Sequence, residues 1–440
     1  MTDVSMRKRA VGSAAIGQFV EWYDFVVYGY LAVTIGKQFF PATDPVAALL
    51  ATFAIYGVGF LMRPLGGLLF GHIGDRRGRR NVLSTIILLM GAATAGVGIL
   101  PTYAVIGIWA PVLLLVCRLI QGLSAGAELI GSNTLVSEYS DPRRRGFLVA
   151  LTSAFAAVPP IFAALFVLLL QNVMTSASFA AWGWRIPFLL GGAMSLVGLY
   201  MRRRLNESPV FEEARAREKV TRAPFREVFT QFKRSLSVTF AIAVLSGLGF
   251  YMLSGYMSSY LTVQVGISSN NALLSNSISF VVVFILTIVS GYLSDRWGRK
   301  PVLTVGTVLM IIMPIPAFLI AGGGTLWSAA FGQSLIAIGV GIYGGTVGSI
   351  FIELFPSRVR FTGGAIGYNA AYVLFAGTAP FLSTWMISRT GNNLAPAFYI
   401  TGVAIVVLIV TFFLKETAGI PLNQIDEESR PARNLVENPS

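Results

Sequence analysis

The chain has 440 residues, of which 55% are hydrophobic and only 12% are charged, and its formal net charge is +13. Soluble domains contain about 25% charged residues, so this composition, with a mean hydropathy of +0.70, excludes an ordinary soluble protein. The apolar residues fall in blocks of roughly 20, the length of helix that crosses ~30 Å of hydrocarbon. We therefore predict an integral membrane protein.

The apolar blocks predict twelve transmembrane helices in chain order. We place them at residues 11–36, 48–74, 81–100, 104–137, 145–172, 184–201, 235–265, 270–294, 301–321, 325–355, 360–387 and 395–414. The chain then has an N-terminal six-helix half at 1–201, a charged cytoplasmic linker at 202–234, a C-terminal six-helix half at 235–414 and a polar cytoplasmic tail at 415–440.

The basic residues are distributed unevenly over the predicted loops. With the N-terminus inside, the cytoplasmic segments hold 28 of the 33 Lys and Arg residues, and the external loops hold three, Lys37, Arg185 and Arg389. Because basic residues gather on the cytoplasmic side of membrane proteins, we predict a multi-pass protein of the cell membrane with both termini in the cytoplasm. The positive charge then serves topology and contact with membrane lipids, and no nucleic acid partner is expected.

Two loops occur twice in the chain, in the same order. The pattern Gly-x-x-x-Asp-Arg-x-Gly-Arg-Arg/Lys appears at residues 71–80 and again at 291–300. A loop similar to the one at 137–146 recurs at 352–363. Repeats half a chain apart in a hydrophobic protein are typical of transporters built from two homologous halves.

The repeated loop resembles the hallmark between helices 2 and 3 of the major facilitator superfamily. Other stretches resemble one branch of it, the metabolite:proton symporter family, and include Glu21-Trp22-Tyr23-Asp24-Phe25, Arg63-Pro64-Leu65-Gly66-Gly67 and Arg118-Leu119-Ile120-Gln121-Gly122. The resemblance implies an all-α, twelve-helix major facilitator bundle of two pseudo-symmetric six-helix halves. Members of this branch carry carboxylates such as shikimate, 2-oxoglutarate and citrate, or proline and betaine, each with protons.

The same resemblance implies a latch of charged residues at the cytoplasmic ends of the helices. Its members would be Asp75, Arg76, Arg79, Glu138, Arg145, Asp295, Arg296, Arg299, Glu353 and Arg360. An aspartate near a helix N-terminus and ion pairs across the halves would hold one conformation by a few kcal/mol.

Ionisable groups inside the predicted helices are the candidates for coupling, because charge is costly in a membrane. Glu21 and Asp24 share a helical stripe with Tyr28, and each carboxylate is either a proton carrier or a fixed ion-pair partner of Arg63 or Arg118. Glu128 is a third proton-coupling candidate. Its place about 15 Å along the helix from Arg118 also suits a gate or a structural role.

Arginine offers a planar fork that matches a carboxylate, so Arg118, with Gln121 on the same helical face, is the predicted substrate anchor. The alternative is an ion pair between Arg118 and Glu21 or Asp24, which the substrate could displace. The other predicted substrate contacts are Arg63, Tyr28, Tyr251, Tyr256 and Tyr368. Aromatic residues at helical spacing also serve as core or membrane interface.

We predict from these features a secondary transporter, not an enzyme, that imports a small carboxylate-bearing metabolite with protons. The alternative is a proton-coupled importer of the osmolytes proline or glycine betaine, favoured by the stretch at 250–261. A drug exporter and a sensor that does not transport are weaker alternatives. No nucleotide-binding loop or metal cluster is seen in the sequence, so we expect no cofactor and no metal, and a monomer that binds only its carboxylate or zwitterionic substrate, protons and lipids.

Overall fold

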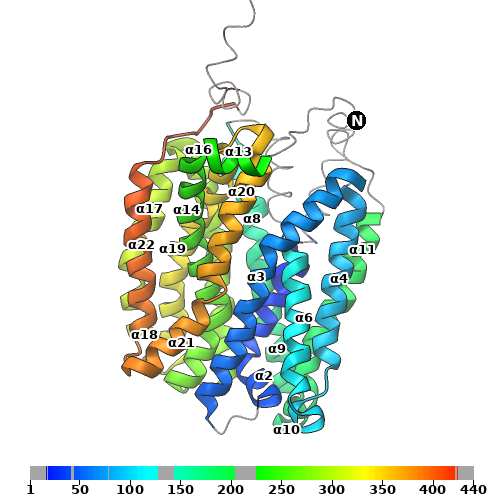
Figure 1. The fold of residues 1–440 in the computed structure, drawn as a ribbon. Coiled ribbons are helices and arrows are strands. Elements are labelled where there is room, and N and C mark those ends of the chain that lie inside the picture. The colour runs from blue at the N-terminus through cyan, green and yellow to red at the C-terminus, as the bar shows by residue number, and fades with distance from the viewer. Residues whose placement is uncertain are drawn as a thin grey trace, which may run out of the picture.

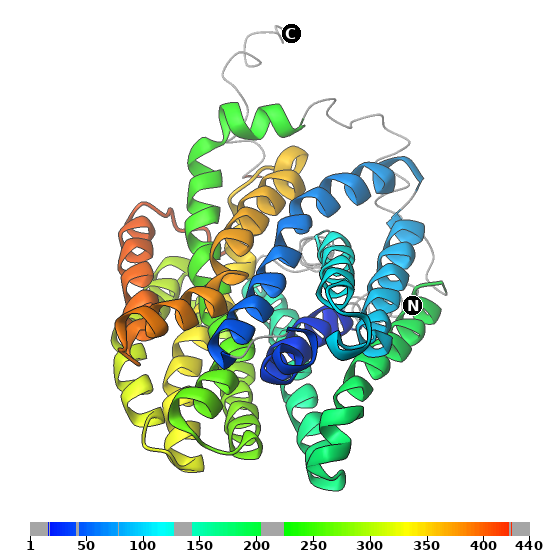
Figure 2. The ribbon, with the colours of Figure 1, turned by 60° about the horizontal axis from the view of Figure 1, so that its bottom comes forward.

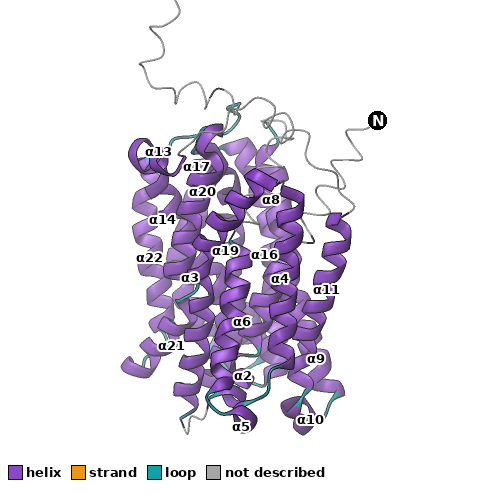
Figure 3. Cartoon of the chain, turned by 45° about the vertical axis from the view of Figure 1, so that its right-hand side comes forward, coloured by secondary structure: helices purple, strands orange, loops and turns teal. Residues whose placement is uncertain are grey.

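The computed structural model describes residues 18–40, 44–77, 79–126, 143–203 and 224–421, with residues 16 and 424. Every regular element in these ranges is helical (Figure 3). The helices form two bundles side by side, one from residues 18–203 and one from residues 224–421 (Figure 1). The all-helical architecture predicted from the sequence is confirmed.

The N-terminal bundle begins with a helix at 18–30. Its further elements are α2 (Ala32–Phe39), α3 (Pro45–Arg77), α4 (Arg79–Ile99), α5 (Tyr103–Ile106), α6 (Trp109–Ala125), α8 (Arg145–Ala154), η1 (Phe155–Ala157), α9 (Val158–Val173), α10 (Ser176–Ala181), η2 (Gly183–Arg185) and α11 (Ile186–Arg203).

The C-terminal bundle follows a short helix, α13 (Pro224–Gln231). Its elements are α14 (Lys233–Tyr251), η3 (Met252–Tyr256), α15 (Met257–Tyr260), η4 (Leu261–Val265), α16 (Ser269–Trp297), α17 (Arg299–Ile312), α18 (Pro314–Ala321), α19 (Leu326–Glu353), α20 (Ser357–Ala371), η5 (Tyr372–Ala376), α21 (Ala379–Thr390) and α22 (Ala395–Phe412).

Seven helices in the described ranges are long and apolar enough to cross a membrane, and an eighth span results if α17 and α18 count as one helix with a 44° bend. Two shorter apolar helices are found at Ser84–Ile99 and Trp109–Ala125. The bend falls at Pro314, whose ring nitrogen has no proton to continue the helical hydrogen bonds.

Several predicted single helices are interrupted in the structure, among them two of the C-terminal bundle. The one predicted at 235–265 contains the π-helical turns η3 and η4, and the one predicted at 360–387 divides into α20, η5 and α21. In the second case Pro380 lacks the amide that would bond to the carbonyl of Ala376, so the regular pattern stops there. The helix predicted at 104–137 is described only as far as Ala125.

Small residues bring α3 and α6 into backbone contact. A Cβ atom at Gly66 would collide with the carbonyl oxygen of Leu123, and one at Gly122 would collide with that of Gly59. Without a hydrophobic drive between helices in lipid, such close approach supplies the packing energy. The contact fixes the positions of Arg63 on α3 and Arg118 on α6.

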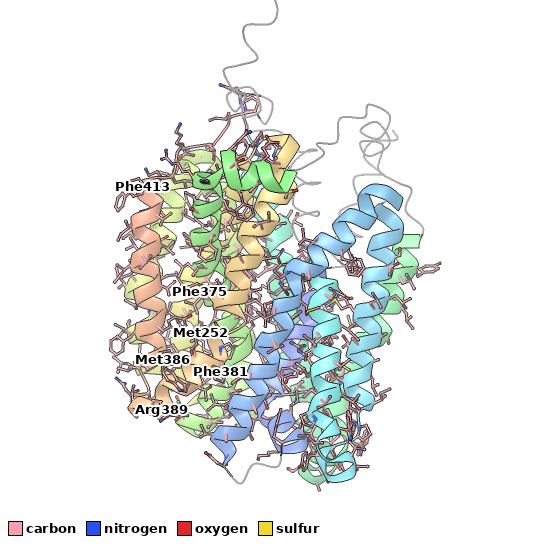
Figure 4. All side chains as sticks on the ribbon, viewed as in Figure 1. Met252, Phe375, Phe381, Met386, Arg389 and Phe413 are labelled. Carbon is pink, nitrogen blue, oxygen red and sulfur yellow. The ribbon has the colours of Figure 1, made fainter. Side chains whose placement is uncertain are left out.

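The two ends of the molecule are named here by their short helices. The α13 end carries α13 and the segment 415–421, and the α10 end carries α2, α10 and α21's last turn (Figure 1). Figure 4 shows Phe413 at the α13 end and Arg389 at the α10 end. Lys37 on α2 and Arg185 on η2 also belong to the α10 end, since Gln38 donates a 2.8 Å hydrogen bond to the carbonyl of Ala180 on α10.

Candidate functional site

The two bundles face each other across an interface that is visible when the molecule is viewed from its α10 end (Figure 2). Near that end the backbones meet, because a Cβ atom at Gly29 would lie 2.8 Å from the Cα of Gly255. At the α13 end, a Cβ atom at Gly291 on α16 would collide with the side chain of Ala150 on α8. Within the described residues, the two bundles therefore touch each other at both ends of the interface.

A cavity of about 90 Å³ lies in this interface. The first helix contributes Gln18 and Trp22, and α8 and η1 contribute the small side chains of Ser153, Ala156 and Ala157. The C-terminal bundle contributes Phe250 from α14, Tyr343 from α19, and Tyr368 and Tyr372 from α20 and η5. None of the described residues that line the cavity is Asp, Glu, Lys, Arg or His, so the site is aromatic and uncharged.

Aromatic rings from both bundles meet beside the cavity. The Trp22 ring lies 4.5 Å from Phe250 and 5.6 Å from Tyr251 between ring centroids. Tyr251 lies 6.0 Å from Tyr372, which in turn lies 4.0 Å from Tyr368. Of the predicted substrate contacts, Tyr368 lines the cavity, and Tyr251 does not line it but packs against Trp22, which does. Such faces attract a ligand cation.

Asp24 and Arg118 form a buried polar cluster within the N-terminal bundle. An Arg118 Nη1 lies 3.7 Å from the Asp24 Oδ2 and donates a 2.8 Å hydrogen bond to Gln121. The Asp24 Oδ1 accepts bonds from Gln121 at 2.7 Å and from Thr94 at 2.9 Å. The Arg118 guanidinium also lies 4.4 Å from the centre of the Tyr28 ring. The cluster is held by four side chains from three helices.

Glu21 and Arg63 form a second buried ion pair, with 3.2 Å between the Glu21 Oε1 and the Arg63 Nη2. The Arg63 guanidinium lies between two rings, 4.6 Å from the centre of Phe25 and 4.7 Å from that of Phe60. Arg63, Arg118, Gln121, Tyr28 and Tyr256 are not among the residues that line the cavity. Both ion pairs are those given as alternatives in the sequence analysis.

A polar network joins the bundles on the α10 side of the cavity. Tyr30 donates hydrogen bonds to Asn276 at 2.5 Å and to the carbonyl of Pro160 at 3.2 Å. Asn276 donates to Gln333 at 2.7 Å, and Gln333 donates to Ser275 at 2.6 Å. The sequence prediction did not include this network as a site, although buried amides in apolar helices were a signal.

At the α13 end the structure pairs four of the residues predicted for the latch, Arg145, Asp295, Arg299 and Glu353. Arg145 of the N-terminal bundle lies 2.6 Å from the Glu353 carboxylate, and Arg299 lies 3.3 Å from it. Asp295 pairs with Arg299 at 2.7 Å and accepts from the backbone amides of Gly146 and Phe147 at 2.9 and 2.7 Å. A carboxylate at the start of α8 is favoured by the helix dipole.

The other predicted latch residues are placed differently or lie outside the described side chains. Arg360 donates to the carbonyl oxygens of Ile352 and Phe355 at 3.0 and 3.1 Å, and Arg296 is exposed. The predicted roles of Asp75, Arg76, Arg79, Glu128 and Glu138 fall on side chains that the structure does not describe.

Sequence reasoning missed that the segment after α22 is part of this latch. The Glu416 carboxylate accepts from the backbone amides of Arg299 and Lys300, at the start of α17, at 2.7 and 3.1 Å. Thr417 donates to Glu353, and the Ile420 carbonyl accepts from Arg145 at 3.1 Å. Burial raises the pKa of Glu416, but the backbone amides that bond to its charged form outweigh burial and lower that pKa.

Gly298 makes room for this contact. Its φ of 105° lies in the region that favours glycine, and a Cβ atom there would lie 2.5 Å from the Glu416 Oε2. The second copy of the repeated loop thus ends in a backbone turn that presents two amides to a carboxylate.

Among the described residues, two helical bundles around a small cavity, with buried charges beside it and ion pairs across one end, have the architecture of a secondary transporter of the major facilitator type. The solved structures agree on the fold. The proton:xylose symporter XylE bound to 6-bromo-6-deoxy-D-glucose superposes with a TM-score of 0.77 at 17% identity, over 97% of this chain and all of that one. A second structure, a D-xylose-proton symporter, gives 0.73 at 18% identity, over 93% and 98%. The predicted fold class is confirmed.

The chain belongs to the sugar (and other) transporter family, whose model matches residues 11–428. Curated relatives match over nearly the whole chain. The proline/betaine transporter of Escherichia coli K12 is 36% identical over 96% of this chain and 86% of its own. The glycine betaine/proline/ectoine/pipecolic acid transporter OusA of Dickeya dadantii is 35% identical over 96% and 85%. A putative proline/betaine transporter of Staphylococcus aureus COL is 33% identical over 95% and 91%.

Proposed function

We propose that this transporter imports a small zwitterionic osmolyte, of the proline or betaine type, together with protons across the plasma membrane. The observation that carries the proposal is the 33–36% identity, over at least 95% of the chain, to relatives named as proline and betaine transporters. The alternative that the sequence offered is therefore better supported than its first interpretation, a di- or tricarboxylate carrier.

The chemistry of the cavity supports the same choice. A di- or tricarboxylate would bring two or three negative charges into a cavity whose described lining has no basic side chain, and buried charge without a partner is costly. A zwitterion brings no net charge, and its cation would meet the faces of Trp22, Phe250 and Tyr372.

Asp24 is the proposed proton carrier, with Arg118 as its charge partner. The carboxylate is fully buried, lies 3.7 Å from the arginine and is oriented by Gln121 and Thr94. Protonation of Asp24 would remove the negative charge that Arg118 faces, and so weaken the contact that holds these two helices in one arrangement. Glu21 with Arg63 is a second candidate for the same role.

The α13 end is proposed to face the cytoplasm. Lys37, Arg185 and Arg389, the basic residues of the predicted external loops, belong to elements of the α10 end. The positive-inside rule then assigns the ion-paired end to the cytoplasmic side.

The test is uptake into proteoliposomes with an imposed proton gradient. Proline and glycine betaine should accumulate, and a protonophore should abolish the accumulation. Citrate, 2-oxoglutarate and shikimate, offered under the same conditions, should not accumulate. Accumulation of one of these acids without proline or betaine would restore the carboxylate interpretation, and accumulation that followed sodium would refute proton coupling.

A further inference from the structure

Gln18 and Trp22 combine deep burial with polar atoms that have no partner. The two side chains are 1% and 4% exposed, and both line the cavity. Within the described part of the chain, three of their atoms have no hydrogen-bond partner: the Gln18 Nε2, the Gln18 Oε1 and the Trp22 Nε1. The residues are four apart in a helix, so they project from the same face one turn from each other.

Buried polar groups in native proteins are nearly always hydrogen-bonded, so these atoms indicate a ligand. Gln18 offers an amide donor and a carbonyl acceptor, and Trp22 offers one donor. A ligand that gives each of the three atoms a partner needs acceptor atoms for the Gln18 nitrogen and the Trp22 nitrogen, and an N–H of its own for the Gln18 oxygen. A dicarboxylate has only acceptors at neutral pH, and a quaternary ammonium compound has no N–H.

An α-amino acid meets all three requirements. Its carboxylate and its ammonium group are attached to the same carbon, so the edge of a single primary amide can accept from one and donate to the other. The second carboxylate oxygen is then available to the Trp22 N–H. The ring of a secondary amino acid would lie against the apolar and aromatic lining supplied by Phe250 and Val347.

We propose that Gln18 and Trp22 contact the substrate directly, and that Gln18 sets the selectivity between zwitterions that carry an N–H and those that are fully N-methylated. The proposal rests on the function proposed above, since it assumes a zwitterionic substrate. The Gln18 Nε2 and the Trp22 Nε1 donate to the carboxylate, and the Gln18 Oε1 accepts from the ammonium. Arg118 makes its bonds to Asp24 and Gln121 and supplies none of these contacts.

N-methylation removes only one of these bonds. A fully methylated ligand keeps the two bonds to its carboxylate and gains contact between its methyl groups and the aromatic faces. It leaves the Gln18 oxygen buried without a partner, which a site built to hydrogen-bond its ligand penalises strongly. The glutamine oxygen is therefore the selective group, and the indole N–H is common to both classes of ligand.

A matched pair of ligands tests this arrangement. Proline and N,N-dimethylproline differ only in the two methyl groups on nitrogen, and their binding to the purified full-length protein can be measured by isothermal titration calorimetry. Gln18→Met keeps the length of the side chain and removes its polar atoms. The control is Gln171→Met on α9, the same substitution at a partly exposed residue that does not line the cavity.

Gln18→Met should weaken proline by about 10-fold more than it weakens N,N-dimethylproline, as expected when a buried hydrogen bond to a charged group is lost. Trp22→Phe should weaken both ligands by a similar factor, because the bond to the carboxylate is common to them. Gln171→Met should leave both affinities within about twofold.

Equal weakening of the two ligands by Gln18→Met, loss of both, or no change in either would overturn the selectivity role. Retained binding of N,N-dimethylproline also shows that the variant is folded. Failure of the wild-type protein to bind either ligand is a different outcome, because it would refute the proposed function itself.

Discussion

Replacing Glu353 by glutamine should open the α13 end. This carboxylate accepts hydrogen bonds from Arg145 at 2.8 Å and from Arg299 at 3.3 Å, and it is 2% exposed. Both arginines are no more than 1% exposed. Glutamine carries no charge, so the two buried guanidinium groups would lose the negative charge that they share. This cost falls only on the closed state, because opening would let water reach both guanidinium groups.

The size of the effect follows from that burial. Removing one partner of a buried ion pair costs about 3–5 kcal/mol, and each 1.4 kcal/mol is about a factor of ten in an equilibrium constant. Destabilisation of the closed state by this amount would raise the open population by roughly a hundredfold to a few thousandfold. The population of the open state cannot rise further once that state dominates, so we expect an increase of at least about tenfold.

Thiol labelling measures this population. Cys117 is the only cysteine of the chain, so Cys117→Ser gives a background on which Ala150→Cys can be labelled alone. Ala150 is 0% exposed and lies against Gly291 of the other bundle, so its label reacts only when the α13 end opens. Glu353→Gln should raise the labelling rate by at least about tenfold.

The matched control is Arg296→Gln, a change of charge at an exposed residue of the loop that carries Arg299, which should leave the labelling rate unchanged within about twofold. A Glu353→Gln rate that matches the parent would refute the reasoning, because the ion pairs would then contribute nothing to closure. An equal rise in both variants would show that charge in the loop matters and that the buried pairs do not.

Three further predictions concern single residues. Asp24→Asn should abolish proton-driven accumulation in proteoliposomes and keep counterflow exchange, since exchange needs only a loaded carrier that reorients; full accumulation in the variant would exclude Asp24 from coupling. Arg118→Lys should reduce transport at least about tenfold, because lysine keeps the charge but lacks the planar guanidinium that bonds Gln121 and faces Asp24 at the same time. Uptake within twofold of wild type would contradict this. Glu416→Gln should speed amide hydrogen exchange in residues 415–421 at pH 7. The loss in the free energy of protection should be less than about 1 kcal/mol, because the side chain is largely solvated. Because the pKa of Glu416 is lowered in the folded state, its carboxylate stabilises the segment 415–421 at neutral pH and loses this effect as the pH falls through the folded pKa, below the ordinary value of 4.5. The exchange rates of wild type and variant should therefore become equal in acid. A difference in exchange rate that persists in acid would refute the assignment.

The all-helical fold could be predicted from the sequence, because apolar length and repeats are properties of single helices and of their order. The resemblance to the major facilitator superfamily implied how the helices are arranged. The sequence also predicted that Arg118 and Gln121 share a face, and they are joined by a 2.8 Å hydrogen bond. Helical spacing determines such pairs within one helix. The pairing of Asp24 with Arg118 and of Glu21 with Arg63 was one of several combinations, since spacing says nothing about which helices become neighbours.

The cavity itself could not be predicted in this way. Gln18 lies one turn before Trp22 on the cavity side of the first helix, whereas the predicted coupling residues of that helix were Glu21 and Asp24. Nothing in the local sequence distinguishes an unpaired glutamine from one with a partner. Glu416 was assigned to a polar tail because its bonds are to backbone amides 116 and 117 residues away. Long-range contacts to the backbone leave no periodic signal in either segment.

The structure separates the charges from the cavity and connects them through rings. Arg63 lies against Phe60, Phe60 lies 5.1 Å from Tyr251, and Tyr251 lies 5.6 Å from Trp22, which lines the cavity. A ligand that moves the Trp22 ring must therefore also disturb Tyr251 and the apolar walls around the Glu21 ion pair, because packed rings have few alternative positions. Coupling of this kind needs no contact between substrate and charge. The variant Phe60→Leu tests this route, because it preserves every ionisable group. It should bind substrate normally in equilibrium titrations but accumulate it poorly in a proton gradient. If coupling were directly electrostatic, accumulation by the variant would be unchanged.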